Sequence, residues 1–426
     1  MRNMKDSGVE WIGAIPMHWN ISRNKNLIYE INDRCDANTT LPLLSVSEYY
    51  GVAPKAERIE EGAFLSRAES LEGYKICQPN DVAMNIMLAW KRAQAVSKYH
   101  GIISPAYCVY RKREDALLNM DYFHYLIRSD LYVNVFKRYS TGIIESRLRL
   151  YPEKFLALYS HLPPVEEQEQ IARTLDKKSA QVDTLIANVQ SQIEKLKAYK
   201  QGVITEVVTK GLDPTVPMKD SGVEWIGTVP AHWSIIPSKF LFANCDERRR
   251  ANDVQLTASQ KYGMISQEEY MRRENSRIVL ADKGLENWKH VEPFDFVISL
   301  RSFQGGLEMS EVTGCATWHY IVLRARQEIH PYYYKWLFKS PMYITALQRT
   351  CNYIRDGQDL RYSNFVKVPL CIPTLDEQRQ IADYLDKKCD QIDRLIAIKQ
   401  AKIEKLEQYK RSLIYEYVTG KKEVTA

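Results

Sequence analysis

The sequence lacks the features that mark secreted, membrane-spanning and zinc-binding proteins. Its 426 residues include eight cysteines, but neither a Cys-x-x-Cys pair nor a tight cysteine cluster, so we expect reduced thiols rather than a disulfide framework or a zinc site. No segment approaches the roughly 18 apolar residues of a membrane-spanning helix, and the N-terminal MRNMKDSGVEWIG holds no apolar signal core. These absences predict a cytoplasmic protein with no membrane partner.

Motifs of catalysis are also missing. The sequence contains no Asp/Asn-Pro-Pro-Phe/Tyr motif of amine methylation, no Gly-x-Gly-x-x-Gly cofactor loop, no phosphate-binding loop with Gly-Lys-Ser/Thr and no His-Glu-x-x-His metal motif. Methyl transfer or an ATP-driven step needs such elements. We therefore predict that the chain is not an enzyme by itself, and we assign it no catalytic residue, no metal ligand and no cofactor. An intact methyltransferase or nuclease with unfamiliar motifs is the alternative.

A long helical pattern is present twice. The first copy runs from about Pro163 to Lys210 and the second from about Pro373 to Val418. EQEQIARTLDKK in the first copy is matched, 210 residues later, by EQRQIADYLDKK in the second, and QIEKLKAYK is matched by KIEKLEQYK. Proline and acidic residues open both copies, as suits a first helical turn. Each helix has roughly 45 residues and therefore a length of roughly 65 Å.

Apolar residues recur every three or four positions in both helices, close to the 3.5-residue period of a coiled coil. A narrow apolar stripe on so long a helix requires a helical partner, and the nearest candidate is the other copy. We predict that the two helices pair; two independent amphipathic helices on separate domains are the alternative. The predicted seam comprises Leu175, Val182, Leu185, Val189, Leu196 and Val203 in the first copy, and Leu385, Ile392, Leu395, Ile403, Leu406 and Leu413 in the second.

A second repeat defines the domain organisation. MKDSGVEWIG occupies residues 4–13 and again 218–227, followed by AIPMHW and TVPAHW. The tryptophans of this tag are expected to dock on a helix end, and His18 and His232 beside them are expected to be packed structural residues. The order is therefore tag, variable globular part and long helix, all occurring twice. Gly211 and Gly420 are expected to cap the two helices.

The two variable parts combine short β-like runs with helices, and they end in the strand-like segments LALYSHLP and VKVPLCIP. We predict an α+β fold with two mixed α/β domains and two long helices. The helices are alike in sequence and the variable parts are not. That contrast indicates a common frame that carries two different recognition surfaces.

With these residues in view, the chain resembles the specificity subunit of type I restriction-modification enzymes. The resemblance rests on the doubled KDSGVEWIG–IP–HW tag, on the two EQ–Q–IA–LDKK–IEKL helices, and on ISPAY (103–107) and SLRSFQGG (299–306) in the variable parts. The second domain has CATWHY (315–320) where the first has ISPAY, so contacts at that segment are not transferred between the halves. The implied boundaries are 1–160 for target-recognition domain 1, 161–213 for helix 1, 214–370 for target-recognition domain 2 and 371–426 for helix 2.

The resemblance implies a non-catalytic subunit in which each variable domain recognises half of a bipartite, asymmetric site in double-stranded DNA. It implies that the helices form an antiparallel coiled coil with an internal pseudo-twofold repeat, set the spacing between half-sites and bind two methyltransferase subunits. Motor-nuclease subunits would join for restriction. S-adenosylmethionine, ATP and Mg²⁺ would belong to those partners. A methylation-only system and a coiled-coil scaffold that binds no DNA are the alternatives.

The net charge of +6 permits a nucleic-acid partner without requiring one. Arg or Lys reads guanine, Asn or Gln reads adenine, and Lys, Arg and Ser grip phosphates. Solvated surface charge is the competing interpretation for each residue. The candidates in domain 1 are Arg67, Lys91, Arg92, Gln94, Lys98, Arg147 and Arg149; those in domain 2 are Arg248, Arg249, Arg250, Arg272, Arg273, Arg301, Ser302 and Gln304. Function is favoured for the segment from Arg301 to Gln304, where Gly305 and Gly306 would let a loop approach DNA closely.

Overall fold

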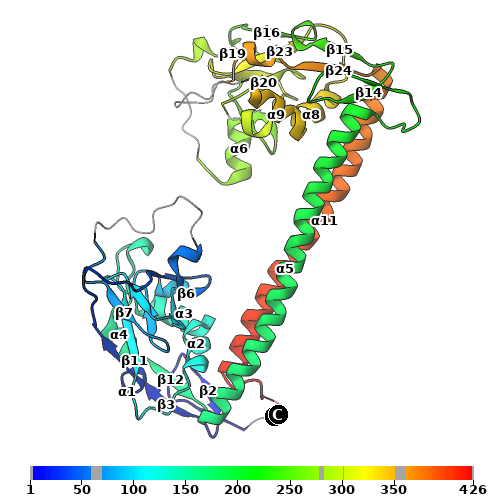
Figure 1. The fold of residues 1–426 in the computed structure, drawn as a ribbon. Helices are drawn as coiled ribbons and strands as arrows, with labels where there is room; N and C mark the ends of the chain where they lie inside the picture. The colour runs from blue at the N-terminus through cyan, green and yellow to red at the C-terminus, as the bar shows by residue number, and fades with distance from the viewer. Residues whose placement is uncertain (1–2, 59–69, 278–282, 301, 351–359, 425–426) are drawn as a thin grey trace. The chain divides into compact units, whose positions relative to one another are not determined.

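The computed structural model describes residues 3–58, 70–277, 283–300, 302–350 and 360–424. Its contacts divide the chain into two compact units, drawn in Figure 1. Unit 1 comprises Met1–Val189 with Ala401–Ala426, and unit 2 comprises Gln190–Gln400. Each unit therefore combines one globular lobe with a part of both long helices. Within the described ranges, no helix combines the length and the apolar character needed to cross a bilayer.

Lobe 1 is the globular part of unit 1. Its tag forms a hairpin of β1 (Met4–Asp6) and β2 (Ala14–Pro16). A four-stranded antiparallel sheet has the order β4-β11-β8-β9, and small two-stranded sheets surround it. The strands of these sheets are β3 (Asn20–Arg23), β4 (Ile28–Ile31), β5 (Leu44–Ser47), β6 (Gly51–Pro54), β7 (Lys75–Cys77), β8 (Val82–Met84), β9 (Gln94–Val96), β10 (Gly101–Ile103), β11 (Cys108–Lys112) and β12 (Tyr159–Leu162). The helices are α1 (Asn24–Leu27), η1 (Lys55–Arg58), η2 (Ala89–Lys91), α2 (Met120–Arg128), α3 (Asp130–Tyr139), η3 (Glu145–Arg147) and α4 (Pro152–Ala157).

Lobe 2 repeats this plan in unit 2, with the corresponding sheet order β16-β23-β20-β21. Its strands are β13 (Met218–Asp220), β14 (Thr228–Pro230), β15 (Ser234–Pro237), β16 (Phe242–Cys245), β17 (Leu256–Ser259), β18 (Gly263–Ser266), β19 (Lys289–Val291), β20 (Phe296–Ile298), β21 (Glu308–Met309), β22 (Gly314–Ala316), β23 (Ile321–Ala325) and β24 (Pro369–Ile372). Its helices are η4 (Ser238–Phe240), α6 (Gln267–Glu274), η5 (Leu285–Asn287), α7 (Ser302–Gly305), α8 (Pro331–Lys339), α9 (Pro341–Arg349) and α10 (Tyr362–Phe365). The two variable parts thus share one topology despite their unlike sequences, and the predicted mixed α/β fold is confirmed.

Each lobe contains two consecutive helices separated by a single serine. Ser129 separates α2 from α3, and Ser340 separates α8 from α9. In lobe 2 the Ser340 hydroxyl caps α9 by accepting a hydrogen bond from the Tyr343 amide at 3.4 Å. A serine N-cap offers the backbone this partner at the start of a helix, which permits a new helix to begin at once.

The long helices are α5 (Val165–Lys210, 46 residues) and α11 (Leu375–Val418, 44 residues). They run side by side and antiparallel in both units. In unit 1, Lys410 Nζ lies 2.7 Å from the Asp183 carboxylate. In unit 2, Lys200 Nζ lies 2.8 Å from Asp393 Oδ1. Residue numbers rise along one helix as they fall along the other, so the predicted pairing of the two helices with each other is confirmed.

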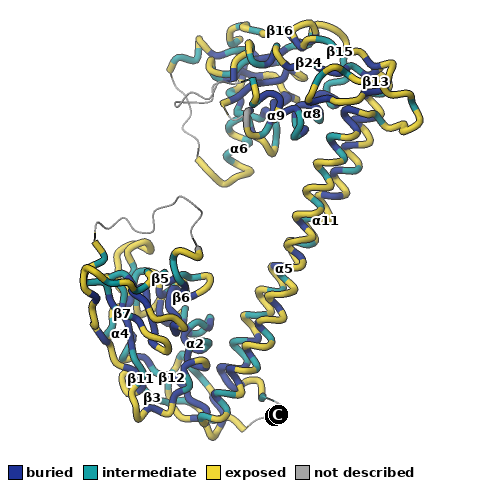
Figure 2. The backbone as a smooth tube through the Cα atoms, in the orientation of Figure 1, coloured by how far each residue is buried: buried dark blue, intermediate teal, exposed yellow. Residues whose placement is uncertain are grey.

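The coiled-coil seam differs from the predicted seam at two positions. Leu185 and Leu395 are 49% and 48% exposed and point away from the partner helix. The inward positions beside them are taken by Ile186 and Ile396, which are half-buried. Buried residues follow each helix as a narrow stripe, drawn dark blue in Figure 2. The prediction chose the first apolar residue of each Leu-Ile pair, and strict alternation of three- and four-residue steps selects the second.

The core of each lobe includes the start of one long helix and the end of the other. The lobe 1 core contains Ile171 and Leu175 of α5 together with Tyr417 and Val418 of α11. The lobe 2 core contains the corresponding parts, such as Ile381 of α11 with Val208 of α5. Each helix end is thus buried by a lobe rather than left to fray, and the apolar ends of both helices stabilise the lobes on which they dock.

The tag docks on the first turn of the long helix that follows its own lobe. His18 Nε2 and Trp19 Nε1 lie 2.7 and 3.1 Å from Glu167 Oε2. In lobe 2, His232 Nε2 and Trp233 Nε1 lie 2.8 and 3.0 Å from Glu377 Oε1. These repeated contacts confirm docking on a helix end and explain why the His-Trp pair occurs in both tags. The histidines are about half exposed and bind the helix, so they have a structural partner as predicted.

Both long helices end at a glycine in the left-handed region, as predicted. Gly211 has φ +76° and Gly420 has φ +70°. The tag tryptophan of each unit packs beside this glycine. A Cβ at Gly211 would lie 3.3 Å from Trp233 Cζ2, and one at Gly420 would lie 2.4 Å from Pro16 Cγ. At position 420 a larger residue is therefore disfavoured for two reasons: its Cβ would clash with Pro16, and the left-handed backbone conformation favours glycine.

Candidate nucleic-acid interface

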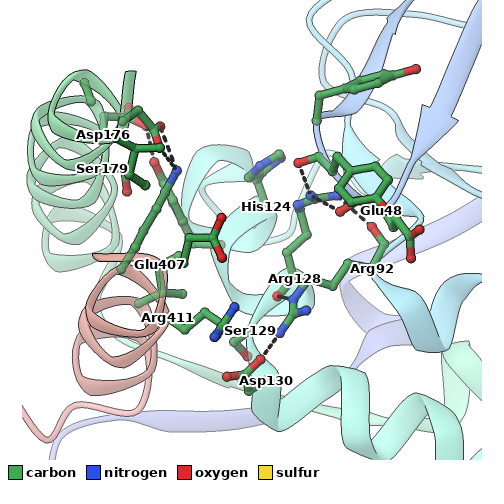
Figure 3. Close-up of a pocket in the computed structure, with 18 of the residues that line it drawn as sticks. Glu48, Arg92, His124, Arg128, Ser129, Asp130, Asp176, Ser179, Glu407 and Arg411 are labelled. Atoms are coloured by element: carbon green, nitrogen blue, oxygen red, sulfur yellow. Dashed lines mark hydrogen bonds and ion pairs between the residues drawn. The ribbon is translucent and has the colours of Figure 1, made fainter. Parts of the chain in front are cut away.

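A polar cleft in unit 1 contains two of the predicted residues, Lys91 and Arg92. It has a volume of about 880 Å³ and lies between lobe 1 and the adjoining parts of α5 and α11 (Figure 3). Five basic and five acidic side chains line it, so its charge is mixed rather than uniformly positive. The basic residues are Lys91, Arg92, Arg128, Lys410 and Arg411, and the acidic ones are Glu48, Asp130, Asp176, Asp183 and Glu407.

Arg128 forms the wall of this cleft and serves the fold. Its Nη1 donates to the carbonyl oxygens of Arg92 and Gln94 at 2.7 and 2.8 Å, and its Nη2 donates to the carbonyl of Glu48 at 3.1 Å. Burial, with the nearby Arg92 charge, lowers the pKa of Arg128 to about 10, so it stays cationic at neutral pH. Arg128 therefore joins α2 to the edge strand β9 and to the turn after β5, and its donors are already engaged.

Arg92 and Arg411 bring two guanidinium groups to the mouth of the cleft. Arg92 has φ +66°, forms an ion pair with Asp130 and donates from Nε to the Arg128 carbonyl at 3.2 Å. Burial and then the charge of Arg411 lower the pKa of Arg92. Arg411 is exposed on α11 and faces Arg92 across the gap in Figure 3. Two guanidinium groups that repel each other favour an anion between them, and phosphate matches their geometry.

Cations also cover Trp90 beside this cleft. Lys91 Nζ and Lys137 Nζ lie 4.9 and 5.2 Å from the Trp90 ring centroid. Lys137 also pairs with Glu145. Lys91 is exposed, and the ring holds its ammonium group near the opening. The predicted residues Lys91 and Arg92 thus come together with Arg411, which the sequence interpretation missed because basic residues on a long coiled-coil helix usually only solubilise it.

The other predicted residues of lobe 1 do not share one location. Gln94 is fully buried, and its Nε2 donates to the Ile127 carbonyl at 2.9 Å. That engagement disfavours a base contact by Gln94, although the role stays a prediction. Lys98, Arg147 and Arg149 are exposed and available to solvent. Arg67 lies outside the described residues.

Most predicted arginines of lobe 2 have acidic or carbonyl partners. Arg272 and Arg273 of α6 both pair with Glu269, which lowers the pKa of that carboxyl to about 2. Arg250 pairs with Glu247 and Glu292. Arg248 is exposed and donates to the Asn287 carbonyl at 2.7 Å. Arg249 is half-buried. DNA contact by these residues stays a prediction, and it would have to replace the existing partners of the paired ones.

The segment favoured in lobe 2 is only partly accessible. Arg301 lies outside the described residues. Ser302 is 1% exposed, and its hydroxyl accepts from the Ser299 amide at 2.8 Å. Gln304 is exposed. The glycines that follow have a packing role, because a Cβ at Gly306 would lie 2.0 Å from the Phe338 carbonyl and one at Gly305 would lie 2.3 Å from Gln260 Nε2.

Comparisons with known proteins agree with the architecture. Residues 244–408 match the family model for the type I restriction modification DNA specificity domain. A putative type I restriction enzyme MjaX specificity subunit of Methanocaldococcus jannaschii is 24% identical over 307 residues, which cover 70% of this chain and 67% of that protein. The MjaVIII specificity subunit of the same organism is 37% identical over 78 residues, or 18% of this chain and 17% of that protein.

The fold also has a counterpart among solved structures. A chain from a study of complex assembly and conformational transition of the type I R-M system aligns with a TM-score of 0.67 at 15% identity. The alignment covers 95% of this chain and 98% of that chain. At this identity the likeness concerns the fold alone: two mixed α/β lobes and two long helices.

Proposed function

We propose that the chain is a specificity subunit of a type I restriction-modification system and that it selects the DNA sequence on which such a complex acts. The match of residues 244–408 to the specificity-domain family model and the likeness to the MjaX specificity subunit support this proposal. Lobe 1 recognises one half of a bipartite, asymmetric target in double-stranded DNA, and lobe 2 recognises the other half. One observation carries this proposal: the lobes have the same strand order but different side chains at the exposed positions. A shared backbone with unlike surfaces suits two reading modules with different targets.

Exchange of lobe 1 tests the proposal. Residues 14–162 would be replaced by the corresponding lobe of another specificity subunit, and methylated sites in the host genome would be mapped before and after. We expect one half-site to change and the other to persist. A reciprocal exchange of lobe 2 is the matched control and should alter the other half. An unchanged modified sequence would favour a scaffold that binds no DNA.

We propose that the basic residues at the mouth of the unit 1 cleft bind DNA phosphates. Arg411 and Lys91 are exposed there, and Arg92 forms an ion pair with Asp130. Contacts of this kind position a protein on DNA without reading its sequence. Base contacts would come from other exposed residues of each lobe.

We assign partner binding to an exposed apolar pair on the coiled coil of each unit. Leu185 and Tyr409 in unit 1 are 49% and 53% exposed and flank the Asp183–Lys410 ion pair. In unit 2, Leu395 and Tyr199 are 48% and 52% exposed and flank the Lys200–Asp393 ion pair. Large apolar side chains exposed in matched pairs favour an interface. The presence of one pair in each unit fits two copies of one partner, and we propose methyltransferase subunits.

Charge substitution at these pairs tests the stoichiometry. The double variant L185E/Y409E should lose one of two methyltransferase subunits, and L395E/Y199E should lose the other, each read as a drop of one subunit mass in native mass spectrometry. The matched control L212E changes an exposed leucine of the linker and should leave the mass unchanged. Retention of both subunits by both double variants would contradict the assignment.

The remaining parts of the proposal concern spacing and chemistry. We propose that the long helices set the number of unspecified bases between the half-sites. A seven-residue insertion in α5 with a matching insertion in α11 preserves the seam and should change only the spacer.

Methyl transfer with S-adenosylmethionine, and ATP- and Mg²⁺-dependent steps, belong to partner methyltransferase and motor-nuclease subunits. Incubation of the isolated chain with DNA and S-adenosylmethionine should therefore give no methylation.

A further inference from the structure

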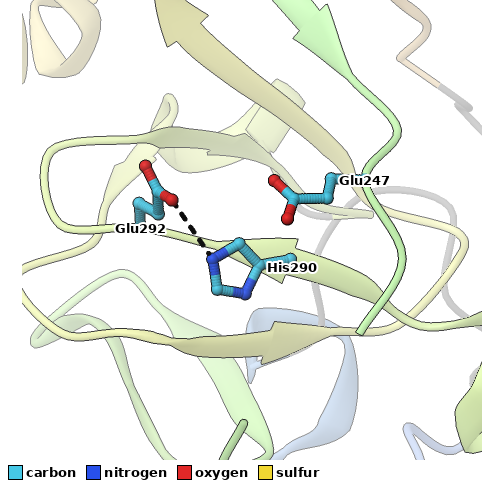
Figure 4. Close-up of side chains that lie close together, drawn as sticks. All are labelled: Glu247, His290 and Glu292. Carbon is cyan, nitrogen blue, oxygen red and sulfur yellow. Dashed lines mark ion pairs between the residues drawn. The ribbon is translucent and has the colours of Figure 1, made fainter. Parts of the chain in front are cut away.

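Lobe 2 contains a cluster of potential metal ligands. Glu247, His290 and Glu292 each present one ligand atom, and these atoms all lie within 4.8 Å of one another (Figure 4). His290 is completely buried, whereas the two glutamates are half-buried and reach it from the solvent side. We propose that this cluster binds a divalent transition-metal ion of the Zn²⁺ type.

The orientation of His290 supports coordination through Nε2. Its Nδ1 lies 2.8 Å from Asp253 Oδ2, and Asp253 is itself only 8% exposed. Donation from Nδ1–H to a carboxylate fixes the tautomer and leaves a lone pair on Nε2. This carboxylate-histidine pair is the usual support behind a metal-bound histidine. Among the described residues, Nε2 has no hydrogen-bond partner although it is buried.

The spacing of the donors fits a small ion. His290 Nε2 lies 3.4 Å from Glu292 Oε1. Two ligands at about 2.0–2.1 Å from a tetrahedral Zn²⁺ are about 3.3 Å apart. Glu247 needs a modest side-chain movement to complete the set, and its partial exposure permits this. Water can take the fourth position. One imidazole with two carboxylates suits Zn²⁺ better than Mg²⁺ or Ca²⁺, which prefer oxygen donors alone.

The local charge also favours a divalent cation. Arg324 forms two hydrogen bonds with Asp295, at 2.9 and 2.7 Å, and its Nη1 also lies 3.6 and 3.5 Å from Glu247 and Glu292. Around the cluster, four carboxylates (Glu247, Asp253, Glu292 and Asp295) therefore face two guanidinium groups (Arg250 and Arg324), which leaves an excess of two negative charges. Arg250 bridges the two glutamates, with contacts of 2.6 and 3.1 Å, and its side chain is 53% exposed. It therefore occupies the position of the cation and can swing out when a metal binds.

Lobe 1 provides a natural control, because the same framework there keeps a carboxylate at Asp33, the counterpart of Glu247, but lacks the other two donors. Ile76 occupies the position of His290: its amide donates to the Asp33 carbonyl as the His290 amide donates to the Glu247 carbonyl, each at 2.8 Å. Gln78 occupies the position of Glu292, and the backbone amide of each donates to the carboxylate of the aspartate three residues later, at 2.9 and 2.8 Å. The paired arginine is also shared, as Arg111–Asp81. The ligand set is therefore specific to lobe 2 and is not needed by the fold.

Metal titration of the intact chain tests this inference. After chelator treatment, Co²⁺ and then Zn²⁺ would be added while visible absorption, calorimetry and thermal unfolding are recorded. We expect one ion per chain with nitrogen-oxygen coordination and a rise in the unfolding temperature of the lobe 2 transition. E292Q should weaken binding about tenfold or more. D33N, the lobe 1 counterpart of a Glu247 change, should bind as the unaltered chain does.

The variant R250M distinguishes loss of a metal ligand from misfolding, because a misfolded variant could only lose metal affinity. Removal of the competing guanidinium should tighten Co²⁺ binding, the opposite of the E292Q effect, and unfolding of each variant without metal would confirm its fold. Equal affinity in the unaltered chain, E292Q and R250M would overturn the inference. Strong thiolate-to-Co²⁺ charge-transfer bands would also overturn it, because they would assign binding to cysteines.

Discussion

Lobe 1 and lobe 2 share one strand order, but different polar side chains occupy corresponding positions in the two lobes. At the end of α2, Arg128 is held by backbone carbonyl groups. At the end of α8, Lys339 pairs instead with the buried Glu308. Burial raises the pKa of Glu308. This difference indicates that the topology depends on apolar packing and strand register. A buried polar side chain can be replaced when its hydrogen-bond partners are replaced with it.

Each lobe binds the end of one long helix through two side chains that contact a backbone carbonyl group, and we call these two side chains the socket. The two sockets show the same contrast. In lobe 1, Tyr122 and His161 contact the Val418 carbonyl at the end of α11, with distances of 3.4 and 2.5 Å. In lobe 2, Tyr333 and Cys371 contact the Val208 carbonyl near the end of α5, at 2.9 and 3.6 Å. Tyrosine is common to both sockets, and the second donor changes from an imidazole to a thiol. Only the imidazole makes its socket sensitive to acid.

The largest expected difference between the lobes comes from the two helix-ending glycines. G420A should lower the free energy of unfolding of unit 1 by about 3 kcal/mol, because the added Cβ would meet Pro16 and the left-handed backbone disfavours alanine. G211A should cost unit 2 less, about 1–2 kcal/mol, because its left-handed backbone also disfavours alanine but its Cβ would lie 3.3 Å from Trp233 Cζ2, a tight contact that a small shift relieves. Urea unfolding of the two variants measures both. Equal costs would show that the sockets are packed alike.

The second largest expected difference is in the response to acid: the stability of unit 1 should decrease at low pH more than the stability of unit 2. Burial lowers the pKa of His161 from 6.5 to about 4, and its Nδ1 has no hydrogen-bond partner within the described part of the chain. Between these values the unfolded chain binds a proton that the folded chain does not. Stability of unit 1 therefore falls as pH decreases from about 6.5 towards 4, by about 2 kcal/mol at pH 5. H161C, which installs the lobe 2 donor, should remove much of this slope in pH-dependent unfolding; an unchanged slope would assign it elsewhere.

Loss of the socket tyrosines should have a smaller effect. Y333F leaves the Val208 carbonyl with only the weak Cys371 thiol, so we expect a loss of about 1–2 kcal/mol. Y122F leaves Val418 with His161 and should cost about 1 kcal/mol, mainly from the lost bond to the His161 carbonyl at 3.0 Å. Thermal unfolding compares the pair. A larger loss in Y122F would reverse this order of the two sockets.

The smallest effects are expected on DNA affinity. R411A should weaken binding to all sequences by about threefold to tenfold and reduce the salt slope by about one, because it removes one phosphate contact. R272A is the matched change in lobe 2, where the arginine already pairs with Glu269, and it should change the slope less. Fluorescence anisotropy at several salt concentrations measures both. A sequence-dependent loss in R411A would instead indicate base recognition.

Elements with long or repeated patterns could be predicted from the sequence, and individual contacts could not. Repetition identified α5, α11 and the tag, because each apolar stripe needs a partner of the same length. The seam was misplaced at Leu185, since two adjacent apolar residues satisfy the period almost equally. Side-chain partners far apart in sequence escaped prediction: nothing in the sequence alone pairs Arg128 with the carbonyl of Glu48, or Arg250 with Glu292 in preference to DNA.

The metal cluster shows the same limit. The sequence led us to expect no metal ligand, because Glu247 and His290 are 43 residues apart and match no motif. They meet because His290 on β19 bonds the backbone of Glu247, a contact fixed by the fold. A metal site of this kind can be recognised only after the strands have been placed.

Unit 1 is completed by Val418, the last residue of α11, which docks into a socket built from residues made about 300 positions earlier. During synthesis, lobe 1 therefore leaves the ribosome before the residue that fills its socket has been made. Lobe 2 must be completed before Val418 emerges. The N-terminal unit is the first to begin folding and the last to finish. A chain truncated shortly before Val418 should expose the socket and become a substrate for chaperones or proteases, while unit 2 would already be closed.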